Sequence, residues 1–216
     1  MSAGGRAHYP GLMPSEEPVV SSRDATVSPS MIFVALAALA ACWLLLMPPG
    51  SGPDETGHVT RAGAVIRGEW QSQNRYALPD RYQVAEPSCY AFQPTVPVSC
   101  TPVPDHVGAT LELSTNAGAY PVWGHLWYGA FTVLPVLDPV WWARIGGAAV
   151  AVALVGWSVV SAQRRSATLA TGLLVGLTPM AWSTFGTVNP STFVIAGATA
   201  LWIGLLTLTT EPPSRW

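Results

Sequence analysis

Five apolar runs, separated by polar segments, dominate the pattern of hydrophobic and polar positions in this chain of 216 residues. The first run covers residues 31–47 (MIFVALAALAACWLLLM), and a long polar segment follows it as far as residue 119. A helix needs about 20 mostly apolar residues to cross a hydrocarbon core ~30 Å thick, because each residue rises ~1.5 Å. The pattern therefore predicts an all-α, polytopic transmembrane fold that begins with a membrane helix over residues 30–48.

The four later runs fill most of the segment 120–210, which we expect to form membrane helices. The last three, residues 140–162, 167–186 and 190–209, are each long enough to cross a membrane. The first of the four, residues 120–137 (YPVWGHLWYGAFTVLPVL), is short and carries the Tyr and Trp residues that favour membrane interfaces. Its His125 lies between Trp123 and Trp127 and can face either a cavity or the membrane interface, and we expect the interface. The sequence thus predicts four spanning helices plus a fifth element, for a total of 4–5 transmembrane helices.

The topology depends on whether residues 120–137 cross the membrane. If they cross, Arg164, Arg165 and Arg215 lie outside the cell; if they dip in or lie on the surface, these arginines lie inside with the amino terminus. The tendency of positive charge to stay inside favours the second arrangement. We therefore expect a multi-pass protein of the cell membrane with a cytoplasmic amino terminus, and Asn189 then emerges on the outer side.

Composition supports this class of protein and describes its ends. Half of the residues are hydrophobic and only 10% are charged, against roughly 25% in soluble domains. Residues 1–29 are polar and rich in Gly, Pro and Ser, which predicts a disordered cytoplasmic tail. Residues 211–216 form a short carboxy-terminal tail. The net charge of -2 gives no indication of a nucleic-acid partner.

The extracytoplasmic loop, residues 49–119, begins with a short predicted helix over residues 54–68. Ser51 or Asp54 can cap its start and Gly68 can end it. Four apolar residues share one face, which predicts an amphipathic helix near the membrane surface: Val59, Ala62, Val65 and Ile66. Many prolines predict that the rest of the loop is mostly irregular.

Two cysteines, Cys89 and Cys100, lie in this loop within the sequence CYAFQPTVPVSC. Outside the cytoplasm the environment permits a disulfide, and closing so short a loop contributes about 3 kcal/mol in the chain-entropy account. The alternative is two free thiols. We expect the disulfide.

An acidic pair follows the first membrane helix directly, and it is the main candidate for chemistry. Asp54 and Glu55 are adjacent, and His58 shares a helix face with Asp54 because it is four residues later. A carboxylate here can act as a base towards an acceptor hydroxyl, and Asp54 with His58 is a weak candidate for binding a divalent cation. The structural alternative is that Asp54 caps the helix, Glu55 favours its positive end, and both are solvated.

Three further residues are candidates for substrate binding. Arg61 and Arg67 lie on or just after the short helix, where they can pair with the phosphate of a substrate. The alternative is that they are ordinary interfacial arginines, which extend towards lipid phosphates without binding a substrate. Asn189 is a candidate polar group that closes the site; alternatively it caps a helix that starts at Pro190. The sequence contains no Walker loop, GxGxxG, GxSxG or zinc-type cluster, so soluble nucleotide chemistry has no support.

Several motifs occur in an order that resembles a known family: GPDETGHVTRAGAVIRGEW, CYAFQPTVPVSC, an aromatic segment starting YP, and LTPMAWSTFGTVNPSTF. Over about residues 30–210 the chain resembles the N-terminal half of the bacterial membrane family called domain of unknown function 2142. That family is similar to the GT-C membrane glycosyltransferases, which transfer sugar from a polyprenyl-phosphate carrier on the outer face of the membrane. The resemblance implies that Asp54 is the catalytic carboxylate, with Glu55 beside it.

The chain departs from the family in two places. The aromatic segment reads YPVWGHLWY where the family usually has YPPLYY, and members of the class have about twice as many membrane helices. The resemblance therefore implies a glycosyltransferase fragment or subunit of the cell envelope that needs a second membrane subunit for the missing helices, or that is inactive alone. Two alternatives remain open, a non-catalytic membrane scaffold that partners an enzyme and a protein that binds or transports a lipid carrier.

Overall fold

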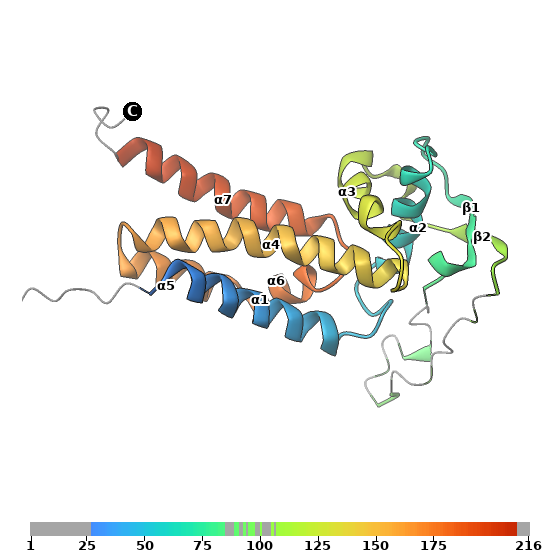
Figure 1. Ribbon diagram of the computed structural model, residues 1–216, viewed down its shortest axis with the longest axis horizontal. Coiled ribbons are helices and arrows are strands. Elements are labelled where there is room, and N and C mark those ends of the chain that lie inside the picture. The colour runs from blue at the N-terminus through green and yellow to red at the C-terminus, as the bar shows by residue number, and fades with distance from the viewer. Residues whose placement is uncertain are drawn as a thin grey trace, which may run out of the picture.

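A computed structural model shows a bundle of helices with a smaller, mixed region at one end (Figure 1). We call the cap the region made of α2 (Glu55–Ile66), α3 (Val122–Thr132), β1 (Arg75–Pro79) and β2 (Thr110–Ser114). The other helices form the membrane bundle: α1 (Pro29–Leu46), α4 (Pro139–Gln163), α5 (Ala167–Gly176), α6 (Pro179–Phe185) and α7 (Ser191–Thr210). The predicted tails 1–29 and 211–216 fall almost wholly outside the described residues. The structure describes residues 27–84, 89, 90, 93, 95–97, 100, 105 and 107–210.

Three helices of the described residues are long and apolar enough to cross a membrane: α1 (Pro29–Leu46), α4 (Pro139–Gln163) and α7 (Ser191–Thr210). They agree with the membrane helices predicted over residues 30–48, 140–162 and 190–209. α4 packs against both of the others, through a core that includes the buried Ala151 and Val155. Small residues in this core let the helix axes approach closely, which is how helices pack inside lipid.

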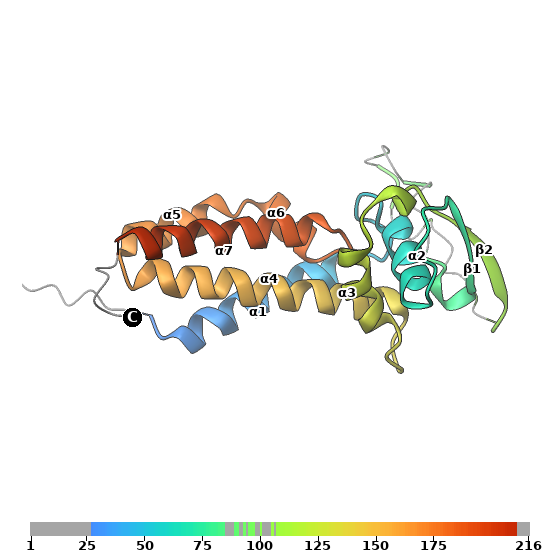
Figure 2. The same ribbon diagram turned by 90° about the horizontal axis from the view of Figure 1, so that it is seen from above.

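The expected span over residues 167–186 is not one helix. It is divided into α5 (Ala167–Gly176) and α6 (Pro179–Phe185). Pro179 has no N–H to continue the helical ladder and pushes the preceding residue out of the helical region, so Thr178 adopts an extended backbone. α5 and α6 follow one another along the bundle (Figure 2). The described residues therefore contain three continuous candidate spans where four were expected.

The aromatic segment 120–137 forms α3 (Val122–Thr132), whose 11 residues extend only about 16 Å and cannot cross the membrane. α3 packs against α2 in the cap. The carboxyl end of α1 and the starts of α4 and α7 all meet the cap, while the other end of the bundle carries the start of α1 and the turn between α4 and α5 (Figure 1). This matches the predicted arrangement in which the aromatic segment does not cross.

The short helix predicted over residues 54–68 is α2 (Glu55–Ile66). Gly68 ends it as expected: its φ of 91° is left-handed, and the N–H groups of Gly68 and Glu69 donate to the carbonyls of Val65 and Ala64, both at 3.0 Å. The sequence predicted one buried apolar face, but α2 is buried on almost every side. Its small residues allow this; a Cβ on Gly63 would lie 2.5 Å from the ring of Tyr82.

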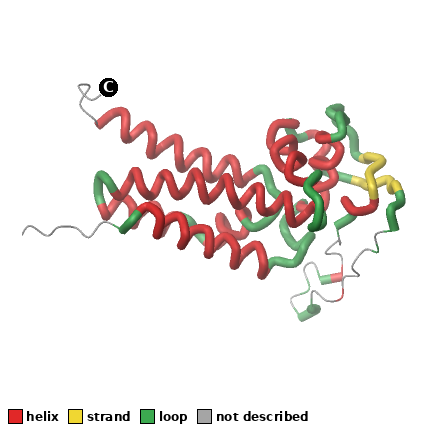
Figure 3. Tube along the Cα trace, in the orientation of Figure 1, coloured by secondary structure: helices red, strands yellow, loops and turns green. Residues whose placement is uncertain are grey.

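A two-stranded antiparallel sheet corrects the all-α prediction. β1 (Arg75–Pro79) pairs with β2 (Thr110–Ser114), and the strands lie at the far end of the cap (Figure 3). Asp80, directly after β1, accepts N–H groups from Val107, Gly108 and Ala109 at 2.6, 2.7 and 3.1 Å. Burial raises the pKa of the Asp80 carboxyl, but these three backbone donors outweigh that effect and lower the pKa below its usual value. They also tie the two ends of the long connection together.

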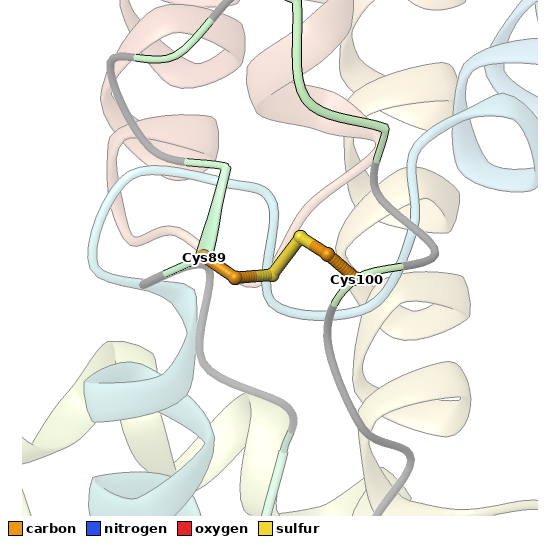
Figure 4. The surroundings of a disulfide bond; sticks show 2 residues. All are labelled: Cys89 and Cys100. Carbon is orange, nitrogen blue, oxygen red and sulfur yellow. A yellow bond between two sulfur atoms is a disulfide. The ribbon is translucent and has the colours of Figure 1, made fainter.

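The predicted disulfide is confirmed. Cys89 and Cys100 are bonded, with their Cα atoms 6.0 Å apart (Figure 4). It closes a short loop within the connection between β1 and β2, and 14 of the 30 residues of that connection lie outside the described part of the chain.

Candidate functional site

Asp54 stands directly before α2 and is exposed to solvent. Its backbone is left-handed, with φ 57° and ψ 13°, a conformation that costs a non-glycine residue roughly 1–2 kcal/mol. Its carboxylate makes no capping hydrogen bond to the helix. Instead Oδ1 accepts a hydrogen bond from Nδ2 of Asn116 at 2.7 Å. The capping role considered above is therefore not adopted.

An open, polar cleft of about 660 Å³ lies between the start of α2 and the adjoining ends of the two strands. Arg75 supplies the cation of this cleft; its side chain is 71% exposed and only loosely paired with Glu112, at 3.7 Å. The lining combines one carboxylate, one guanidinium, two amides and three hydroxyls, a set suited to a ligand rich in hydroxyl groups. The lining residues are Asp54, Thr56, Gly57, Asn74, Arg75, Ser114, Thr115 and Asn116.

Glu55, the other half of the acidic pair, is fully buried and faces the membrane bundle. Arg144 of α4 donates to both of its oxygens, from Nε to Oε1 and from Nη2 to Oε2, each at 2.7 Å. The backbone N–H groups of Gly50 and Val188 donate to the same carboxylate, both at 2.9 Å. The idea that both carboxylates are solvated is therefore wrong for Glu55, whose oxygens are all engaged inside the protein.

Arg144 completes this buried junction. Besides Glu55, its guanidinium donates to the carbonyls of Leu44, Met47 and Pro48 at the end of α1. The ion pair thus joins α1, α2, α4 and the loop before α7. Sequence reasoning did not select Arg144 for this role. One signal was available, since Arg144 is the only charged residue in the apolar run 140–162, and a charge in such a run usually has a buried partner.

His58 faces α3 and not Asp54's cleft. Its Nδ1 lies 3.1 Å from Nε2 of His125, and Nδ1 of His125 lies 3.2 Å from the carbonyl of Pro121. The carbonyl can only accept, so His125 carries its proton on Nδ1 and receives a hydrogen bond from His58. Burial, reinforced by His125, lowers the pKa of His58 to about 4. His125 is also fully buried, so its expected place at the interface is wrong.

No group of three or more His, Cys, Asp or Glu residues is placed to hold a metal ion within the part of the chain that the structure describes. Asp54 and His58 were the two weak candidates. His58 directs one ring nitrogen at His125, and no third side chain of these types joins the two residues among those described. The arrangement offers no preformed cation site there.

Arg61 is buried and holds the turn after α2 together. It donates to the carbonyls of Glu69, Trp70 and Gln71 and to the hydroxyl of Tyr76. A guanidinium enclosed in this way has little freedom to meet a phosphate. It stabilises the turn that leads from α2 into β1.

Arg67 is exposed at the far end of α2, where its guanidinium lies 5.3 Å from the centre of the Tyr82 ring. It follows Asp54 by 13 residues, a separation of about 20 Å along the helix. Neither Arg61 nor Arg67 lines the cleft. Arg75, which sequence reasoning did not select, does so, and its position became visible only once the strand was known.

Asn189 lies at the same end of the bundle as the acidic pair, as expected. Its side-chain oxygen accepts the N–H of Ser191 at 2.9 Å, and its carbonyl accepts the hydroxyl of Tyr128 at 2.8 Å. The neighbouring Val188 bonds to Glu55. Asn189 therefore caps the start of α7, the alternative considered above, and does not line the cleft.

Comparison with known proteins identifies a family. The model of a family described as "Predicted membrane protein (DUF2142)" matches residues 37–215, most of the chain. No curated protein matches. No solved structure matches either.

Proposed function

We propose, from the premise that this chain belongs to the DUF2142 family of predicted membrane proteins, that it is a GT-C-like glycosyltransferase subunit or fragment. Its substrate class is a sugar carried on a polyprenyl phosphate, which a protein of the bilayer meets at head-group level. One observation carries the proposal: Asp54, an exposed carboxylate in a left-handed backbone, lines a polar cleft at one end of the candidate spans. Unusual backbone of this kind is concentrated at functional sites.

In this mechanism Asp54 is the general base. Its carboxylate takes the proton of an acceptor hydroxyl, and the hydroxyl oxygen forms a bond to the anomeric carbon of the sugar. The bond from that carbon to the phosphate oxygen breaks, and polyprenyl phosphate leaves with the bonding electrons. Asn116 holds the carboxylate in place through its 2.7 Å hydrogen bond to Oδ1, and Oδ2 is the oxygen that accepts the proton.

The leaving phosphate needs a cation, and Arg75 is the candidate inside the cleft. Arg75 takes the phosphate-binding role that the sequence suggested for Arg61 and Arg67. Those two arginines contact the turn after α2 and the ring of Tyr82 instead. Glu55 and His58 become positioning residues in the proposal. They hold the start of α2 against the bundle and against α3 and do not touch the substrate.

The test is Asp54→Asn, assayed for sugar transfer in membranes from cells whose own copy of the gene is deleted. Loss of a general base typically costs 10²–10⁴-fold, so transfer should fall by at least about 100-fold while the protein stays folded in the membrane. Asp138→Asn is the matched control, because Asp138 is also an exposed aspartate directly before a helix and makes no capping bond. Normal transfer by Asp54→Asn would contradict the assignment.

A non-catalytic scaffold is the second candidate. The observation that favours it is that Glu55, His58 and Arg61 all make polar contacts inside the protein, as residues that stabilise a fold do. A scaffold predicts that Asp54→Asn leaves transfer by a partner enzyme unchanged, while substitutions that unfold the cap abolish it. The same assay therefore separates the two candidates.

A further inference from the structure

α3 and the loop after it expose a set of apolar and aromatic side chains. Trp123 is 77% exposed and Val136 is 93% exposed. Residues 113–137 contain no Asp, Glu, Lys or Arg. We call this set the aromatic face; its members are Tyr120, Trp123, Leu126, Trp127, Val133, Leu134, Val136 and Leu137.

The depth of α3 follows from its contacts with α4. Trp127 donates its indole N–H to the carbonyl of Gly146 at 3.1 Å, and a Cβ on Gly146 would lie 2.6 Å from the ring of Phe131. Gly146 comes seven residues after Pro139, where α4 begins. α3 therefore touches α4 about 10 Å along its axis, measured from its start.

That point lies within the membrane. The 25 residues of α4 extend about 37 Å, which exceeds a ~30 Å hydrocarbon core by only about 7 Å. Even if the whole excess projects on the side of the cap, Gly146 lies inside the core, because it is further from the start of the helix than the excess. Trp127 and Phe131 thus reach the hydrocarbon boundary beside α4.

The other contacts of α3 place it across the start of α7 as well. A Cβ on Gly124 would lie 3.5 Å from the ring of Phe193, and the rings of Tyr128 and Phe193 are 5.3 Å apart. Phe193 is the third residue of α7. α3 accordingly lies beside the cap-side ends of both α4 and α7 (Figures 1 and 2).

We propose that α3 and residues 133–137 form a half-inserted membrane anchor whose aromatic face lies in the lipid of the leaflet nearest the cap. The opposite face of α3, with His125, Tyr128, Gly129 and Thr132, is buried in the protein. Lipid is the occupant because the face is uncharged, carries two exposed Trp and one exposed Tyr of the interfacial type, and continues the membrane surface of α4 and α7. The anchor fixes the cap, and with it the cleft, at head-group depth. This inference stands without the proposed sugar transfer.

The experiment places a polarity-sensitive fluorophore on single cysteines of the full chain. Cys42, the free and exposed cysteine, is first replaced by Ala; Cys89 and Cys100 stay protected in their disulfide. The test variants are Trp123→Cys and Val136→Cys. Val107→Cys in the cap is the aqueous control and Val194→Cys on α7 is the lipid control; both positions are exposed in the structure. All are reconstituted in phosphatidylglycerol–phosphatidylethanolamine vesicles with acyl chains brominated near the head group.

We expect labels at positions 123 and 136 to show blue-shifted emission, several-fold quenching by the brominated lipid, and little quenching by aqueous iodide, as at position 194. Position 107 should show the reverse. Behaviour like that of position 107 would overturn the anchor. Protection from both quenchers would also overturn it, because a protein partner then covers the face. Leu137→Cys repeats the test if either variant fails to fold, since that side chain is also exposed.

Discussion

The membrane bundle and the cap are built on opposite chemistry. The bundle packs alanine, valine and leucine from helices whose candidate spans carry hardly any charge. The cap, with its junction to the bundle, buries charged and titratable groups: Glu55 with Arg144, Arg61 among carbonyls, and His58 with His125. The contrast teaches that charged residues next to a membrane helix are not functional by position alone. Most of them here stabilise the cap, and Asp54 and Arg75 are the ones that face the polar cleft.

The largest effect is expected from removing the buried charge that joins the cap to the membrane bundle. Arg144→Met leaves the Glu55 carboxyl group buried without its cationic partner, and loss of one partner of such a pair costs about 3–5 kcal/mol. We expect a corresponding drop in the free energy of unfolding in detergent, followed by circular dichroism. Arg164→Met is the matched control, because Arg164 is an exposed arginine at the other end of α4. An equal drop in the free energy of unfolding in both variants would show that the buried ion pair does not stabilise the protein more than an exposed arginine does.

The cap and the membrane bundle should also differ in their response to acid, because low pH should destabilise the cap before the bundle. The folded cap holds His58 with a pKa of about 4, against about 6.5 in the unfolded chain. Between these values the unfolded state binds more protons, so the free energy of unfolding falls as the pH drops through this window. The full loss is on the order of 3 kcal/mol.

The measurement is hydrogen exchange of α2 and α3 amides at pH values from 7 to 4, corrected for the intrinsic pH dependence of exchange. Protection in the cap should fall with acid while protection in α4 holds, and His58→Gln should flatten the profile. A cap that keeps full protection at pH 4 would show that the histidine pair does not report its stability.

The bundle could be predicted from the sequence because apolar length and composition decide where helices cross lipid. Residues 30–48, 140–162 and 190–209 became α1, α4 and α7 with small shifts at the ends. The same hydropathy gave a continuous span over residues 167–186, although Pro179 could have indicated the break. The end of α2 at Gly68 and the disulfide also followed from local chemistry.

The cap could not be predicted to the same extent, because its contacts join residues far apart in the chain. The sheet pairs residue 77 with residue 112 across a proline-rich connection. The partner of Glu55 is 89 positions away, and no periodicity reports such a pairing. Of the predicted site residues, Asp54 is the one that lines the cleft. The sequence suggested the same role for Glu55 because the two residues are adjacent. The structure turns the two carboxylates to opposite environments.

Asp54 is exposed at the cleft, whereas Glu55 is buried in an ion pair. Thermal unfolding of Asp54→Asn and Glu55→Gln side by side in detergent tests this difference most directly. We predict that Glu55→Gln loses about 3–5 kcal/mol, because Arg144 then keeps a buried charge without a counter-ion. Asp54→Asn should stay within about 0.5 kcal/mol of the parent, as exposed substitutions usually do. Equal destabilisation of the two variants, or a larger loss for Asp54→Asn, would contradict the claim.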